Sequence, residues 1–248
     1  MRVPLERAEE ARAALLELAA GGFEERDLPG ELELAVYGGP EVEQALSAIY
    51  TDVTSERVDP GWEENWRAFH RPVEIGRLWV GPPWEVAPEA LLPVVIDPGR
   101  AFGTGAHPTT RLSLELLQEL EPASLLDLGC GSGVLAIAAA KLGFGPVTAL
   151  DNDPDAIEAT LANAEANGVS LDVRLADVLA ETLPAAEVAV CNISLPYLEV
   201  MASRLACGTL VGSGFLAREQ PRLYRFEMIE RREDGDWAAV LARRGKER

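Results

Sequence analysis

A run of nine residues near the middle of the chain limits the possible folds most strongly. Residues 125–133 read Leu-Leu-Asp-Leu-Gly-Cys-Gly-Ser-Gly and lead directly into the apolar segment 134–138. A buried strand, glycines at alternate positions and a helix start together build a turn in which the backbone approaches a ligand closely and offers unpaired N–H groups. The run therefore predicts a strand, a ligand-binding turn and a helix in succession.

The spacing of the glycines indicates which ligand the turn binds. Gly129, Gly131 and Gly133 are spaced G-x-G-x-G. A dinucleotide fingerprint is G-x-G-x-x-G, and its third glycine would stand where this chain has Val134. Asp151 ends the next predicted strand, eighteen residues after Gly133, where a carboxylate can accept hydrogen bonds from two ribose hydroxyls. Spacing and acid together favour S-adenosylmethionine as the cofactor; a dinucleotide and a purely structural turn are the alternatives.

From residue 124 onward, short apolar strands alternate with helical segments. The predicted strands are 124–128, 146–151, 171–176, 188–192 and 208–212, and the predicted helices are 133–142 and 154–167. Such alternation predicts a mainly parallel sheet covered by helices on both faces. Residues 225–231 and 237–243 flank Glu-Asp-Gly, which is a hairpin signal. The fold class is therefore α/β, with a Rossmann-like sheet and an antiparallel C-terminal hairpin.

Residues 1–58 have the pattern of a separate α+β domain. Helical patterns cover 6–20 and 41–50, and strand patterns cover 1–5, 24–28, 32–37 and 52–58. The order β-α-β-β-α-β is the split βαβ arrangement of ferredoxin-like domains. We predict a small ferredoxin-like domain here.

Residues 59–93 separate that domain from the cofactor-binding domain, which we expect at residues 94–248. The stretch 59–100 holds many prolines and four of the five tryptophans, Trp62, Trp66, Trp79 and Trp84. It is too apolar for a free linker and too broken for regular structure. We predict an extended connector held by aromatic packing; the alternative is that some of these rings line a substrate cleft.

The charge balance excludes some classes of partner. Asp and Glu number 41 against 22 Lys and Arg, giving a net charge of −19, so the chain lacks the basic surface that holds nucleic-acid phosphates. No stretch approaches the roughly 18 to 20 apolar residues that span a bilayer. Two histidines and three unevenly spaced cysteines fit neither a metal cluster nor a disulfide framework. We expect a metal-free cytoplasmic monomer without a membrane or nucleic-acid partner.

A second unusual run lies upstream of the glycines. Residues 97–111 read Asp-Pro-Gly-Arg-Ala-Phe-Gly-Thr-Gly-Ala-His-Pro-Thr-Thr-Arg. Small and hydroxyl side chains make this a loop rich in hydrogen-bonding groups, and its Pro-Thr-Thr can begin a helix. An ordinary helix start is the simpler interpretation, but it leaves the rest of the run unexplained.

Together, these runs resemble a known family. Residues 97–110, the motif 127–133 with the apolar 135–139, and Trp-Glu-Glu-Asn-Trp at 62–66 leading to 78–84 are similar to the bacterial methyltransferases that modify protein eleven of the large ribosomal subunit. The resemblance covers nearly the whole chain. It implies a ferredoxin-like domain that captures the ribosomal protein and a class I methyltransferase domain that uses S-adenosylmethionine to methylate lysine or other amino groups. Residues 1–60 hold 14 acids against 5 bases, which independently suits a basic client.

The resemblance also implies roles for four residues. Thr110 would contact the cofactor, Gly129 would pack against it and Asp151 would bind its ribose. Asn192, at the end of a predicted strand, would lie beside both the methyl group and the incoming amine, and is the expected catalytic residue.

Other candidates come from local reasoning. Gly131 and Gly133 join the cofactor site because their backbone can approach a ligand closely, and Phe102 and Thr104 are expected pocket neighbours. Asp177 follows a strand and is either a partner of the adenine amine or a solvated loop acid. We find no compelling general base, and we expect His107 to brace its loop.

The last third of the chain departs from the family pattern. Residues 192–197 read Asn-Ile-Ser-Leu-Pro-Tyr, one position shorter than expected, and only 221–225 stand where a full helix is usual. Two alternatives therefore stay open. One is a divergent methyltransferase with another protein or a small molecule as its target. The other is a non-catalytic protein that binds S-adenosylmethionine.

Overall fold

The structure is a computed structural model of the 248-residue chain. It describes residues 1–4, 7, 11, 15, 23–28, 30–36, 40–50, 52–55, 70–98, 103 and 105–245. The chain divides into two compact units, Met1–Glu64 and Asn65–Arg248, and each is described by itself. Within the described ranges, no helix is both long enough and apolar enough to cross a membrane.

The first unit contains a three-stranded antiparallel sheet. Its elements are β1 (Arg2–Pro4), β2 (Phe23–Leu28), β3 (Glu31–Val36) and α2 (Pro40–Ile49), and the strand order is β1-β3-β2. Alternate residues of β3, Leu32 and Leu34, point into a core shared with Leu46 and Tyr50.

Two predictions for this unit need comment. The helix predicted over 6–20 lies largely outside the described residues. The predicted strand 52–58 is wrong for 52–55, which are not a strand. A backbone hydrogen bond from Arg2 N to Asp52 O, at 3.1 Å, joins this segment to β1. Because β1 has only three residues and pairs with β3, it offers 52–55 too short a partner for a strand.

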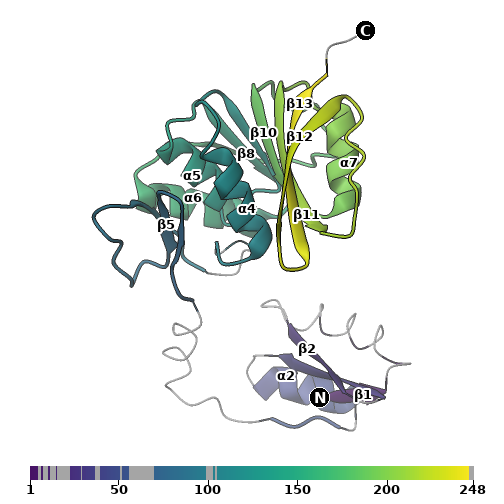
Figure 1. Ribbon diagram of the computed structural model, residues 1–248. Helices are drawn as coiled ribbons and strands as arrows, with labels where there is room; N and C mark the ends of the chain where they lie inside the picture. The colour runs from purple at the N-terminus through teal and green to yellow at the C-terminus, as the bar shows by residue number, and fades with distance from the viewer. Residues whose placement is uncertain are drawn as a thin grey trace. The chain divides into compact units, whose positions relative to one another are not determined.

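The second unit is built on a seven-stranded sheet (Figure 1). The strands are β7 (Leu125–Leu128), β8 (Val147–Asp151), β9 (Asp172–Leu175), β10 (Val188–Asn192), β11 (Thr209–Leu216), β12 (Phe226–Asp234) and β13 (Trp237–Arg244). Their order is β12-β13-β11-β10-β7-β8-β9, with the five strands from β11 to β9 parallel and β13 and β12 antiparallel. The predicted α/β class and the C-terminal hairpin are confirmed.

Helices cover both faces of this sheet, as Figure 1 shows. On one face lie α4 (Pro108–Leu117), α5 (Val134–Lys141) and α6 (Pro154–Asn167), and on the other lies α7 (Leu195–Arg204). Neighbouring strand residues face opposite cores: Leu125 packs with α4 and α5, whereas Leu126 packs with α7. The central strands are therefore buried on both sides, which accounts for their apolar runs.

The predicted elements differ from the structure at three places. β11 extends to Leu216, beyond the predicted 208–212, because Gly214 at φ 92° allows a bulge between Ser213 and Phe215. The helix α7 was not predicted, although Leu198, Met201 and Ala202 follow the helical period. No helix forms over 217–225, as the shortened sequence indicates, and Leu223 covers the sheet there instead.

The prediction of an irregular connector over 59–93 is wrong for residues 73–75, 78–81 and 92–93, whereas 82–91 are irregular. A second small sheet is formed by β4 (Val73–Ile75), β5 (Leu78–Gly81) and β6 (Leu92–Val95). Burial of Leu78, Val80 and Val94 in the core with α4 and α5 holds these strands in spite of the prolines. Trp62 and Trp66 lie outside the described residues.

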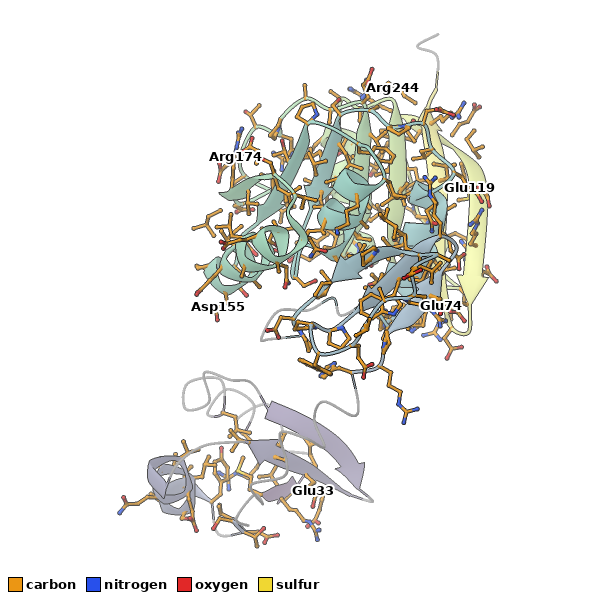
Figure 2. The ribbon with its side chains drawn as sticks, turned by 90° about the vertical axis from the view of Figure 1, so that its left-hand side faces the viewer. Glu33, Glu74, Glu119, Asp155, Arg174 and Arg244 are labelled. Carbon is orange, nitrogen blue, oxygen red and sulfur yellow. The ribbon has the colours of Figure 1, made fainter. Side chains whose placement is uncertain are left out.

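Ion pairs join α4 to the hairpin on the surface of the unit. Arg232 of β12 pairs with Glu119 at 2.5 Å and with Glu115 at 3.5 Å, and Figure 2 shows Glu119 beside the hairpin. Arg111 of α4 pairs with Asp234 at the end of β12. These side chains are partly exposed, so each pair adds little stability, on the order of 0 to 1 kcal/mol.

The second face of the sheet depends on α7, so we expect a large loss of stability when its buried face is truncated. Leu198 is fully buried against Gly212, where an added Cβ would lie 2.7 Å from Leu198 Cδ1. Leu198→Ala should lower the free energy of unfolding by about 2–5 kcal/mol because it leaves a cavity. Val200→Ala, on the same helix and 44% exposed, should change it by less than about 0.5 kcal/mol. Urea unfolding followed by circular dichroism measures both, and equal losses would contradict the role of α7.

Candidate functional site

A cavity of about 610 Å³ opens at the carboxyl ends of the parallel strands. Its walls come from the turn after β7, the end of β8, the loop after β9, the loop after β10, the start of α4 and the bulge of β11. The predicted site residues that it brings together are Thr110, Gly129, Gly131, Asp151 and Asn192. Phe102 and Thr104 lie outside the described residues. Ligands of open α/β sheets bind at this edge, so this is the expected place for a cofactor.

The glycine-rich turn has the backbone that its sequence predicts. Gly129, Gly131 and Gly133 have φ of 73°, 55° and 81°, in the left-handed region that side chains disfavour. Gly133 does not line the cavity: it is the N-cap of α5, and a Cβ there would lie 2.9 Å from Thr160 Cγ2. Its absent side chain lets α6 pack against the turn.

Side chains of α6 bind the carbonyl oxygens of this turn from behind. Thr160 Oγ1 donates to Gly131 O at 2.9 Å, and Asn163 Nδ2 donates to Ser132 O at 2.9 Å. Both side chains are buried. These two hydrogen bonds hold the carbonyl oxygens of the turn toward α6, on the side away from the cavity.

The same supports hold the segment that precedes α4. Asn163 Oδ1 accepts from Asp97 N at 3.0 Å, and Ser132 Oγ donates to Gly103 O at 2.6 Å. Gly103 lines the cavity. Asn163 therefore connects the glycine-rich turn to the loop that the sequence singles out upstream.

Asp151 lies at the end of β8 with its carboxylate directed at the turn. Oδ2 accepts from Gly131 N at 2.9 Å and Oδ1 from Asp153 N at 3.1 Å. The side chain is half-buried and lines the cavity. Asp177, after β9, lines the cavity too; it is exposed, and its Oδ1 accepts from Leu179 N at 2.8 Å.

Thr110 and Asn192 meet at another part of the cavity. Asn192 Nδ2, at the end of β10, donates to Thr110 Oγ1 at 3.2 Å, and Thr110 is fully buried at the start of α4. The amide of Asn192 is thereby fixed with its oxygen available: among the described residues, Oδ1 accepts no hydrogen bond.

His107 braces the start of α4, as expected from the sequence. It is the N-cap residue: its Nδ1 accepts from Thr109 N at 3.4 Å and lies 2.8 Å from Thr109 Oγ1. Its ring meets the ring of Trp237 edge-on, with centroids 4.8 Å apart, and burial lowers its pKa. Sequence reasoning missed Trp237 as a cavity residue; its position beside the turn of the hairpin was the available signal.

Comparisons with known proteins identify the family. The family model for ribosomal protein L11 methyltransferase (PrmA) matches residues 40–245. The chain belongs to this family. The ribosomal protein L11 methyltransferase of Shewanella sp. (strain ANA-3) is 41% identical over 203 residues, 75% of this chain and 69% of the relative. That of Edwardsiella ictaluri (strain 93-146) is 43% identical over 197 residues, 75% of this chain and 67% of the relative.

A solved structure agrees with this assignment. The ribosomal protein L11 methylase from Lactobacillus delbrueckii subsp. bulgaricus superposes with a TM-score of 0.64 at 27% identity, covering 71% of this chain and 99% of that chain. The chain is therefore a methyltransferase that uses S-adenosylmethionine, which confirms the predicted family and cofactor. The cavity fits such a group, since its volume lies within the range of about 300–1,000 Å³ usual for small-molecule sites.

A buried acid lies directly behind the cofactor turn in this methyltransferase. Asp127 in β7 is 1% exposed, and burial raises its pKa from 3.8 to about 7, although Ala136 N donates to its Oδ2 at 3.1 Å. Sequence reasoning did not select it, although an acid within a run of leucines was a visible signal. Its position indicates a role in joining β7 to α5 rather than contact with a ligand.

Asp127 should make stability depend on pH. Because folding raises its pKa, the folded state favours the protonated carboxyl, and the stabilisation present below about pH 4 is lost as the pH rises through about 7. Asp127→Asn stays neutral and can still accept from Ala136 N. We expect the variant to gain stability relative to the unsubstituted protein between these pH values, by up to about 4 kcal/mol. Urea unfolding across the pH range measures this, and a pH-independent difference would contradict it.

The support from α6 predicts an effect on cofactor affinity without contact to the cofactor. Asn163→Ala leaves Asp97 N and Ser132 O without their partner, which should reduce the affinity for S-adenosylmethionine roughly tenfold. The matched control is Asn167→Ala, which loses hydrogen bonds to Val95 but none to the turn. Its affinity should stay within about threefold of the unsubstituted protein. Titration calorimetry measures both, and equal effects would show that the turn does not depend on Asn163.

Proposed function

We propose that this methyltransferase transfers methyl groups from S-adenosylmethionine to amino groups of ribosomal protein L11, lysine ε-amino groups included. Two observations support the acceptor: the curated relatives bear this protein in their names, and residues 1–60 carry the acidic excess that suits a basic client. The observation that carries the chemistry is the Asn192–Thr110 pair, which presents a fixed amide oxygen in the cavity.

In this proposal the parts of the cavity have different tasks. Asp151 binds the ribose hydroxyls, Gly129 and Gly131 allow the backbone to approach the cofactor, and Gly133 lets α6 support the turn. Phe102 and Thr104 are further cofactor neighbours on the basis of the family resemblance. Asp177 stands where it can accept from the adenine amine.

The acceptor amine is oriented by Asn192. S-adenosylmethionine supplies an electrophilic methyl group when it is bound. The Oδ1 atom of Asn192 accepts a hydrogen bond from the neutral amine and leaves the nitrogen lone pair directed at the methyl carbon. A pocket with little water favours the neutral amine over the charged ammonium. Orientation of two reactants in this way can lower a barrier by roughly 7–11 kcal/mol.

The division of the chain follows from the same proposal. Residues 1–58 capture the client and 94–248 perform the transfer, in the cytoplasm where ribosomal proteins are made. The segment 59–93 connects them, and its strands β4 and β5 pack in the core of the second unit. A second candidate is a different acceptor. It is favoured by the segment after β11, where only residues 221–225 stand at the place of the helix that the family resemblance implies, and none of them is helical.

Two substitutions test the roles of the two parts of the site. Asn192→Ala should reduce kcat for methyl transfer to purified L11 about 100-fold, because the amine loses its orientation, while the affinity for S-adenosylmethionine changes little. Asp151→Ala should instead weaken cofactor binding, because the ribose hydroxyls lose their acceptor. We expect the affinity for S-adenosylmethionine to fall about tenfold or more. Transfer of labelled methyl groups and titration calorimetry measure the two effects.

The same assay decides between acceptors. Label on L11 that depends on Asn192 supports the proposal. A folded enzyme that binds the cofactor but leaves L11 unlabelled would overturn L11 as the acceptor and favour another target.

A further inference from the structure

The helix α4 is tied to the sheet by two polar pairs, one partly buried and one fully buried. Asn192 of β10 binds Thr110, and Ser213 of β11 binds Ser113 with 2.7 Å between the two Oγ atoms. Asn192 and Ser213 are directly opposite each other in the β10–β11 register. The second pair therefore lies one strand across and one helical turn along α4 from the first.

The serine pair has a defined direction. Ser113 Oγ donates to Thr109 O at 2.9 Å. A hydroxyl has a single hydrogen, so in the short contact with Ser213 the donor is Ser213. A chain of hydrogen bonds thus runs from Ser213 to Ser113 to the carbonyl of Thr109, the residue just before Thr110.

Burial makes this pair different from the other contacts of α4. Ser113 and Ser213 are both 0% exposed. The ion pairs of Arg232 and Arg111 lie at the surface with partly exposed side chains, and such pairs hold a position weakly. The leucines of α4 pack without a preferred direction. The Ser113–Ser213 pair is thus a fully buried directional link between α4 and β11, next to the partly buried Thr110–Asn192 pair at the cavity.

We propose that Ser113 and Ser213 are positioning residues for methyl transfer, which set the place of α4 and so the geometry of the Thr110–Asn192 pair. This inference rests on the proposed function. Neither serine lines the cavity, so they act through Thr110. Because the Thr110–Asn192 pair orients the acceptor amine in the proposed function, we expect the loss of the serine pair to lower the rate of transfer more than the affinity for the cofactor. Misplacement of a reacting group by about 1 Å can cost up to about 100-fold in rate.

Three variants separate positioning from stability. Ser113→Ala leaves the hydroxyl of Ser213 as a buried donor without an acceptor, whereas Ser213→Ala leaves only an acceptor unused, so Ser113→Ala should unfold at the lowest temperature. The double variant removes both groups and should recover thermal stability. Its kcat should nevertheless stay about tenfold or more below that of the unsubstituted enzyme. The two alanine methyl groups cannot form the directional hydrogen bond that positions α4. The affinity for S-adenosylmethionine should stay within about twofold in all three.

The experiment measures kcat with purified L11, the affinity for the cofactor by calorimetry, and the thermal unfolding midpoint. The rates are measured at a temperature well below this midpoint. The control is Ser203→Ala in α7, an exposed serine whose Oγ also donates to a carbonyl of its own helix, Val200 O at 2.7 Å; it should keep full activity.

Two outcomes would overturn the positioning role: an unchanged kcat in the double variant, or a kcat that recovers together with the unfolding midpoint. The failure of the proposed function is a distinct result, because the unsubstituted enzyme would then leave L11 unlabelled.

Discussion

The hydrogen bonds that hold the carbonyl oxygens of Gly131 and Ser132 toward α6 are the constraint on which the rest of the site depends. Backbone carbonyls must find donors when they are buried, and Thr160 and Asn163 supply them from outside the cavity. Since Asn163 also binds Asp97 N, the loop before α4 takes its place from the same side chain. The helix α6 therefore supports both the cofactor-binding turn and Asp97, at the start of the run that leads to α4.

The acceptor side is supported in a different way. Behind the cofactor turn, a hydroxyl and an amide side chain bind backbone carbonyls, whereas behind Thr110 two hydroxyl groups bind each other across the α4–β11 contact. Both sets of supports rest on the same central strands, which are apolar on both faces. The two halves of the cavity are thus joined through the sheet, and each half is supported by buried polar groups that do not line the cavity.

Local patterns were sufficient to predict the parts of the molecule that depend on neighbouring residues. The strand, turn and helix around Gly129 follow from spacing alone, and Asp151 was found because it ends an apolar strand. Asn192 was selected from the family resemblance. What sequence reasoning missed depends on distant contacts. Ser113 and Ser213 are 100 positions apart, and Trp237 reaches the cavity only because β13 pairs antiparallel with β11. The small β4–β6 sheet was missed because its prolines suggest irregular backbone, while burial of Leu78 and Val80 holds the strands.

Residues 217–225, between β11 and β12, close the core although they form no helix. Leu223 covers the second face of the sheet, and Arg222 N donates to Glu199 Oε1 of α7 at 2.8 Å. At the other end of α7, Arg204 donates to the carbonyls of Val178 and Glu181, at 2.5 and 2.6 Å. Val178 lines the cavity. One helix thus holds both the segment 217–225 and a wall of the cofactor cavity, so the cavity keeps its frame although 217–225 contain no helix.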